Sequence, residues 1–240
     1  MTGNLLVTPI RSVPYRERVM RLWKRLGGEI YRVRVAPWSR NFDSAPFLGR
    51  PVVPFGGFAF CLELAQNLRI SLAEPNLGLL SELEACWVRR RIEVKPAIAL
   101  TSQDFPRFVK SCEYSLVPSQ VYESHYHFKK AAHGIPPDTP LLVAEVVKFS
   151  CEIRTLVCNS EVLSATPYHK SSGVHSGAVN FVAEFAKRVP LPQACIVDVG
   201  RLPDDSWAIV EANPIWAADP LGLDLEAFVL ALGSCCMTAR

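Results

Sequence analysis

The stretch "SWAIVEANPIW", residues 206–216, decides the fold. Its first half is rich in tryptophan, isoleucine and valine, which suit a pleated strand. The strand runs into Glu211 and Asn213, two residues apart, and then meets Pro214. Because side chains alternate along a strand with a period of two, both polar side chains point to the same face. Two hard oxygen ligands on one face predict half of a metal site.

Composition sets the class of protein. The chain has 240 residues, 49% hydrophobic and 20% charged, which is enough to bury one large core or two smaller ones. A net charge of +3 is too small to predict a nucleic-acid partner. No apolar run reaches transmembrane length, and charges follow the N-terminus too early for a signal peptide. We expect a cytoplasmic protein without a membrane or nucleic-acid partner, and a homodimer is compatible with the sequence.

The eight cysteines form no C-x-x-C pair, and several lie within apolar runs. This pattern predicts buried, reduced thiols that fill the core. The segment "ESHYHFKKAAH" brings His125, His127 and His133 close in sequence, which leaves a zinc site as the alternative. No second cluster of ligands has the spacing to complete such a site.

The first ninety residues alternate between strand and helix patterns and predict a small α/β layer in the order β-α-β-β-α-β. The predicted strands are 4–10, 30–36, 51–57 and 69–75, and the predicted helices are 14–29 and 58–68.

From about Arg91 onward strand-like runs follow one another closely. The runs "RRIEVKPAIAL", "LLVAEVVKF", "CEIRTLVCN", "EVLSATPYH", "ACIVDVG" and "WAIVEANP" are the predicted strands, and 178–190 and 227–233 are the predicted helices. The small-residue segment 171–177 predicts a loop between a strand and a helix.

Asp198 ends the strand that precedes the opening stretch. A hairpin with the right register would bring Asp198, Glu211 and Asn213 together, and two carboxylates with a carboxamide suit Mg²⁺. The alternative is structural: Glu211 and Asn213 end a strand and cap a turn, and Asp198 is a solvated strand end.

Three other charged residues lie within apolar strands. Lys95 would serve either as a cation for a nucleotide phosphate or as a surface lysine on an edge strand. Arg154 would need an anion if it pointed inward, and otherwise would pair at the surface with Glu152 or Glu161. Glu145 would accept the ribose hydroxyls of ATP or reach solvent. No glycine-rich phosphate loop is present, so an ATP site would be built from strands and side chains.

The ordered set "EVKP", "VAEVV", "EIRTLV", "SATPY", "VDVG" and "VEANPIW" resembles the ATP-grasp superfamily, in particular the clade named for one arginine and two lysines. The resemblance is strongest over about residues 140–230. It implies an α/β N-terminal domain followed by an α+β ATP-grasp fold, in which two lobes clamp ATP. The implied boundaries are 1–90 for the preceding domain, 91–143 for the N-terminal lobe and 144–240 for the C-terminal lobe.

The resemblance also implies roles for individual residues. Lys95 would contact the phosphates of ATP, Glu145 with the backbone near Val146 and Val147 would hold ribose and adenine, and Arg154 would face phosphate or an acyl phosphate. Mg²⁺ would be held by three side chains: Asp198, Glu211 and Asn213. In the family a second lysine follows the first, just ahead of an aromatic residue. Here "LTSQDFPRF" has Gln103 or its neighbour at that place, with Lys110 and Lys148 as candidate substitutes.

The implied activity is an ATP- and Mg²⁺-dependent carboxylate–amine ligase that forms an amide through an acyl phosphate. Its substrates would be a small-molecule or peptide carboxylate and an amine, a peptide or protein end among them. Tyr168, His169 and Lys170 are candidates for the acceptor pocket. The alternatives are an ATP-grasp phosphotransferase and a catalytically weakened nucleotide-binding or interaction protein, the latter because the second lysine is replaced.

Overall fold

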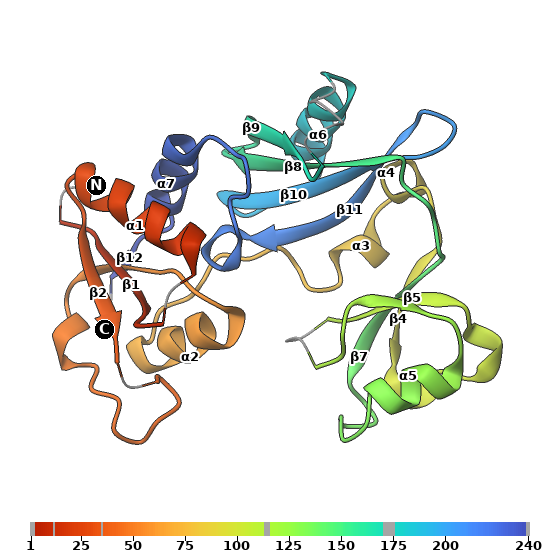
Figure 1. The fold of residues 1–240 in the computed structure, drawn as a ribbon, viewed down its shortest axis with the longest axis horizontal. Helices are drawn as coiled ribbons and strands as arrows, with labels where there is room; N and C mark the ends of the chain where they lie inside the picture. The colour runs from red at the N-terminus through yellow and green to blue at the C-terminus, as the bar shows by residue number, and fades with distance from the viewer. Residues whose placement is uncertain (1–2, 12, 35, 113–115, 170–175, 239–240) are drawn as a thin grey trace. The chain divides into compact units, whose positions relative to one another are not determined.

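The computed structural model describes residues 3–11, 13–34, 36–112, 116–169 and 176–238 (Figure 1). The chain contains mixed α and β elements, as the sequence predicts. Its contacts divide it into two compact units. Unit 1 contains residues 1–75, 152–199 and 212–240, and unit 2 contains residues 76–151 and 200–211. The three domain boundaries given above stay a prediction.

Unit 1 begins with a four-stranded sheet in the order β12-β3-β1-β2. Its strands are β1 (Leu5–Pro9), β2 (Glu29–Val33), β3 (Pro51–Pro54) and β12 (Met237–Thr238). β2 and β3 pair with β1 in parallel, and β12 pairs with β3 antiparallel. The predicted strand at 69–75 is wrong, because these residues are irregular and the fourth strand comes from the C-terminal end of the chain. Residue Arg69 caps the preceding helix in the left-handed conformation, and the indole of Trp216 binds the carbonyl of Ala73, so this segment passes beside the sheet without joining it.

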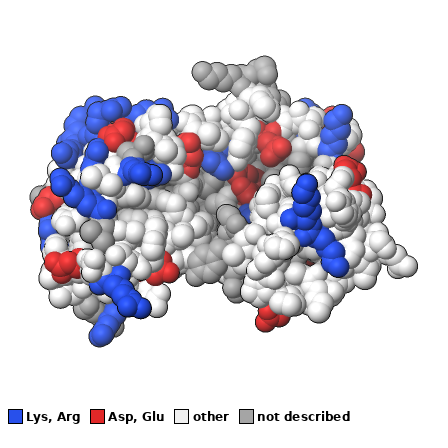
Figure 2. Space-filling view, turned by 60° about the horizontal axis from the view of Figure 1, so that its bottom comes forward, with Lys and Arg blue, Asp and Glu red and all other residues white. Residues whose placement is uncertain are grey.

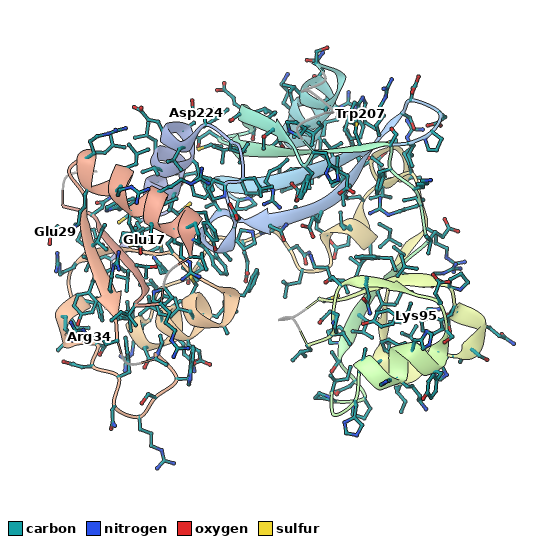
Figure 3. All side chains as sticks on the ribbon, viewed as in Figure 1. Glu17, Glu29, Arg34, Lys95, Trp207 and Asp224 are labelled. Atoms are coloured by element: carbon teal, nitrogen blue, oxygen red, sulfur yellow. The ribbon has the colours of Figure 1, made fainter. Side chains whose placement is uncertain are left out.

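Helices cover this sheet because each buries one apolar face. They are α1 (Pro14–Arg25), α2 (Phe58–Leu68) and α7 (Leu225–Ser234). α1 is shorter than predicted, since the chain leaves the helix at Leu26 and Gly27 takes a positive φ of 84°. Asp224 precedes α7 (Figure 3), and its carboxylate accepts the first free backbone N–H groups of that helix.

A second four-stranded sheet has the order β11-β10-β8-β9. Its strands are β8 (Cys151–Cys158), β9 (Glu161–Pro167), β10 (Ala194–Arg201) and β11 (Trp207–Pro214), and the helix α6 (Ser176–Arg188) lies between β9 and β10 in the chain. Leu156 and Ile196 of this sheet belong to the same buried cluster as Leu6 and Val53 of the first sheet. A single apolar core within unit 1 therefore contains residues of both sheets.

Unit 2 contains an antiparallel sheet in the order β4-β7-β5-β6. Its strands are β4 (Ile92–Pro96), β5 (Arg107–Ser111), β6 (Gln120–Tyr122) and β7 (Pro140–Ala144), with the helices α3 (Leu79–Glu82), α4 (Ala85–Val88) and α5 (His125–Ala131). One face carries a small core in which Val109, Leu141 and Val143 meet Phe128 of α5. Short 3₁₀ turns complete the fold at Ala45–Phe47, Ala97–Ala99, Ser102–Asp104 and Ile215–Ala217.

All eight cysteines are free thiols, as the sequence predicts, but they are less uniformly buried than expected. Cys61, Cys158 and Cys195 are buried, whereas Cys86 is exposed. Burial raises the pKa of the Cys195 thiol to about 12, so this thiol stays protonated at neutral pH. No helix in the described part of the chain has the length and apolar character needed to cross a membrane.

Candidate functional site

Glu211 and Asn213 lie near the end of β11, which confirms the strand predicted for the opening stretch. The strand begins at Trp207 (Figure 3) and ends at Pro214. Both polar side chains are only partly buried and, two positions apart, share one side of the strand. A carboxylate and a carboxamide oxygen at this spacing fit the ligand chemistry of Mg²⁺.

Asp198 on β10 is fully buried and is held by a guanidinium. Arg154 Nε donates to Asp198 Oδ1 at 2.9 Å, and Arg154 Nη2 donates to Oδ2 at 2.8 Å. The Tyr168 hydroxyl donates to Asp198 Oδ2 at 2.7 Å. The solvated strand end considered for Asp198 is therefore wrong. The anion that the inward-pointing Arg154 requires is Asp198, and the bidentate geometry is the strong form of such a pair.

The guanidinium of Arg154 is fixed from a second direction. Its Nη1 donates to the carbonyl oxygen of Asp219 at 2.8 Å, and the residue is 8% exposed. The guanidinium carbon of Arg154, Cζ, lies over the ring of Tyr168, 5.1 Å from the ring centroid. Of the residues predicted for an acceptor pocket, Tyr168 therefore belongs to the Asp198 network, His169 is exposed, and Lys170 lies outside the described residues.

Glu211 meets a lysine of the sheet in unit 2. Lys110 Nζ on β5 donates to Glu211 Oε2 at 2.9 Å. The two side chains are 32% and 31% exposed, so water and a ligand can reach both groups. Lys110 was one of two candidate substitutes for the missing second lysine. The other, Lys148, lies in the irregular segment after β7.

The strand register places Lys110 and Lys95 on opposite faces of this sheet. Lys110 lies opposite Leu142 of β7, and Lys95 lies opposite Leu141, the preceding residue along β7. Residues that pair directly share a face, whereas successive residues of one strand face opposite ways. Lys95 is thus on the face of Leu141 and Val143, which carries the small core, and Lys110 is on the other face, where Glu211 is.

Lys95 is held by two carboxylates (Figure 3). Its Nζ lies 2.8 Å from Asp104 Oδ1 and 3.0 Å from Glu93 Oε1. These hydrogen bonds, first that with Asp104, raise the pKa of Lys95. Hydrogen bonds to Asp104, first that from Lys95 and then those from the N–H and hydroxyl of Thr101, lower the pKa of Asp104 to about 2. Asp104 is next to Gln103, near which the resemblance implies a second lysine. At this place the chain therefore has a carboxylate, Asp104, that pairs with Lys95.

Glu145 follows the last residue of β7 and closes a reciprocal pair with Arg91. The Arg91 N–H donates to Glu145 Oε2 at 2.8 Å, and the Glu145 N–H donates to the Arg91 carbonyl at 3.0 Å. Glu145 itself is exposed, and the next residue, Val146, is 47% exposed. Glu145 and Val146 are therefore accessible to solvent.

Arg90 is a residue that the sequence reasoning missed. It donates from Nη1 to the carbonyl of Ile209 at 2.9 Å and from Nη2 to the carbonyl of Val210 at 3.3 Å. β11 is the edge of its sheet, so on that side no described strand pairs with it. Arg90 therefore anchors the strand immediately before Glu211. The three successive arginines at 89–91 gave no periodic signal that could single out the middle one.

Comparison with known proteins agrees with this geometry. Residues 87–231 match a family model of the ATP-grasp domain, namely family 2 of the clade named for one arginine and two lysines. Among curated proteins, none matches the chain in sequence.

Solved structures share the fold over nearly the whole chain. A RimK domain protein ATP-grasp from Sphaerobacter thermophilus DSM 20745 has a TM-score of 0.61 and 12% identity, with 96% of this chain and 99% of that chain covered. The D-cycloserine synthetase DcsG has a TM-score of 0.58 and 14% identity, with 96% of this chain and 98% of that chain covered. The ATP-grasp ligase PsnB, complexed with the precursor peptide PsnA2 and AMPPNP, has a TM-score of 0.56 and 12% identity, with 98% and 97% covered.

The family model and the fold define an ATP-grasp protein. Because the family model covers more than half of its length, the chain belongs to family 2 of the one-arginine, two-lysine clade of ATP-grasp domains.

Proposed function

We propose that this protein is an ATP- and Mg²⁺-dependent ligase that joins a carboxylate to an amine through an acyl phosphate. The observation that carries the proposal is the pairing of Lys110 with Glu211 at 2.9 Å, at the strand that also bears Asn213. A cation suited to phosphate and a carboxylate suited to a divalent metal are adjacent there, as Mg·ATP requires.

The charges of this pair suit an exchange with the nucleotide. Lys110 and Glu211 neutralise each other without a ligand. Mg·ATP brings a cation for Glu211 and phosphate oxygens for Lys110, so both groups exchange one partner for another of the same charge. The partly exposed pair is screened by water and is worth only about 0.2–1 kcal/mol, so opening it costs little.

The metal would be held by Asp198, Glu211 and Asn213. A carboxylate has about four lone-pair sites, so the bonds of Asp198 to Arg154 and Tyr168 are compatible with a role as a metal ligand. Bound there, Mg²⁺ would neutralise charge on the transferred phosphoryl group.

The chemistry left to the protein is positioning and charge compensation. A substrate carboxylate oxygen attacks the γ-phosphorus of ATP, and ADP leaves. The amine then attacks the acyl carbon, phosphate leaves, and the amine loses a proton. Lys110 would hold phosphate oxygens, Arg154 would face the acyl phosphate, and Glu145 with the backbone of Val146 and Val147 would hold the nucleoside. Each such positioned charge is worth on the order of 10²–10³ in rate.

The predicted contact of Lys95 with the phosphates of ATP stays a proposal, and it requires Lys95 to break its present ion pairs. Lys95 can bind phosphate only if it leaves Glu93 and Asp104, and it starts from the face of the sheet opposite Lys110. Variants of the two lysines therefore measure which of them the nucleotide uses.

A peptide or protein end is the substrate class that we propose for the carboxylate. The support is the structural similarity to PsnB, which was solved with a precursor peptide.

A second candidate is a nucleotide-binding protein with little turnover. Two observations favour it: Glu93 and Asp104 both hold Lys95, and Asp104 lies next to Gln103, near which the resemblance implies a second lysine.

Product analysis tests the proposal. The protein is incubated with Mg·ATP and a library of carboxylates, peptides included, with and without amines. Amine-dependent release of ADP and phosphate supports the ligase. A stable phosphorylated product would mean a phosphotransferase. Nucleotide-dependent thermal stabilisation with no ADP release under any condition would refute the ligase and support the second candidate.

A further inference from the structure

The strand β2 forms one edge of the first sheet (Figure 1). β2 pairs with β1 along Glu29–Val33, and no strand among the described residues pairs with its other side. An open edge presents backbone N–H and C=O groups that can pair with another extended chain. This edge is therefore a place where a further strand could add.

A cationic groove runs along one face of the edge. It has a volume of about 310 Å³ and is lined by α1 and by Ile30 and Arg32 of β2. Arg21 and Lys24 of α1 are exposed in it, and neither has an acidic partner within salt-bridge distance among the described residues. Glu17, the one acidic side chain that lines the groove, is already paired with Arg32 at 2.8 Å. The groove thus offers cations in excess of its anions.

The other face of the edge carries an aromatic groove. It has a volume of about 320 Å³. Its lining combines the aromatic and apolar side chains of Tyr31, Val33, Phe42 and Phe47 with the polar residues Arg32, Arg34, Asn41 and Asp43. The rings of Tyr31 and Phe47 meet edge to face with centroids 4.8 Å apart, and Tyr31 remains 38% exposed. The single carboxylate that lines this groove, Asp43, accepts the backbone N–H of Ala45. Apolar side chains would be buried on this face.

The alternation of β2 matches these two grooves. By strand alternation Ile30 and Arg32 lie on the cationic side and Tyr31 and Val33 on the aromatic side, and Arg32 also contributes to the lining of the aromatic groove. A strand added at the edge would alternate in the same way, with acidic side chains toward α1 and apolar side chains toward the aromatic rings. Figure 2 shows Lys and Arg side chains gathered over this part of the chain.

We propose that the outer edge of β2 binds an extended peptide segment in which acidic residues alternate with apolar ones. A nucleic acid fits the surface less well, because the carboxylates of Glu17, Glu29 and Asp43 stand among the cations and would repel a phosphate backbone. The proposal does not depend on the reaction proposed above, since binding at this edge requires no nucleotide.

Fluorescence anisotropy on the full chain tests the proposal. The probe is a fluorescein-labelled peptide of about ten residues in which glutamate alternates with valine, long enough to pair along the whole of β2. Three comparison probes are the same peptide with lysine for glutamate, the same residues arranged as two blocks, and a single-stranded RNA of about 20 nucleotides, which exceeds the usual site size for single strands. A fourth is the alternating peptide with N-methyl groups on every second amide, which cannot complete a strand ladder.

The test variant is Arg21→Glu with Lys24→Glu, and the matched control is Lys129→Glu with Lys130→Glu on α5, which makes the same change of charge in unit 2. The alternating acidic peptide should bind the unchanged protein. The test variant should bind it about tenfold or more weakly, because the new glutamates of the variant lie opposite the glutamates of the peptide. The control should bind within about twofold of the unchanged protein. N-methylation should abolish binding, and the lysine and block peptides should bind at least about tenfold more weakly.

Each contrary result overturns the proposal. Equal affinity for the alternating and block peptides would mean that charge alone attracts them and that no strand adds. RNA binding tighter than peptide binding, and lost in the test variant, would make the surface a nucleic-acid site. If no probe binds, the proposal is wrong, and the charged side chains along this edge would serve only to protect an edge strand against aggregation.

Discussion

The sharpest prediction concerns Lys110. The substitution Lys110→Met removes one cation, keeps most of the side-chain volume and leaves β5 intact. Because Lys110 and Glu211 are 32% and 31% exposed, we expect the free energy of unfolding to fall by at most about 1 kcal/mol. If Lys110 holds a phosphate oxygen in the transition state, the rate should fall on the order of 10²–10³. The predicted loss of activity is therefore much larger than the predicted loss of stability.

The assay is ADP release under Mg·ATP with the best substrate found by product analysis, alongside urea denaturation. Lys95→Met is the informative comparison, because Lys95 lies on the opposite face of the same sheet. Lys130→Met on α5 is the control for a lost surface charge, and it should retain full activity. The reasoning fails if Lys110→Met keeps its rate within about threefold while Lys95→Met loses about a hundredfold or more. That outcome would assign the phosphate contact to Lys95.

Other variants probe the remaining contacts of the site and of unit 2. Glu211→Gln and Asn213→Ala should abolish Mg²⁺-dependent ATP turnover with unchanged circular dichroism, and turnover at the normal rate in both would exclude the metal site. Asp198→Ala should lower the free energy of unfolding by about 3–5 kcal/mol, since it leaves the buried Arg154 without its anion; a loss below about 1 kcal/mol in urea denaturation would contradict this. Asp104 has a folded-state pKa of about 2, below its ordinary value of 3.8, so its contribution to stability is complete above about pH 4 and disappears as the pH falls through about 2. Asp104→Asn should remove that part of the acid sensitivity, about 1 kcal/mol for a partly exposed pair, as measured by denaturation at about pH 2–5.

The sequence alone predicted the strand through the candidate metal ligands, but it did not predict β5, which bears Lys110. The strand through Glu211 and Asn213 was predictable because its apolar run and its proline are local signals, and the same holds for α2, α6 and α7. The order of several such motifs also predicted the ATP-grasp family, which the family model and the fold confirm.

The tertiary structure decided which side chains form ion pairs and which strands lie next to each other. The sequence could not predict that Asp198 neutralises Arg154, 44 positions away, or that Lys110 meets Glu211, 101 positions away. Strand order and register set those contacts, and a shift of one residue would move each side chain to the other face. For the same reason the segment 69–75 was wrongly predicted as a strand: its local pattern permits one, but β12 from the far end of the chain pairs with β3 instead. Local pattern fixes which residues can form a strand, whereas partner and face depend on contacts between residues distant in sequence.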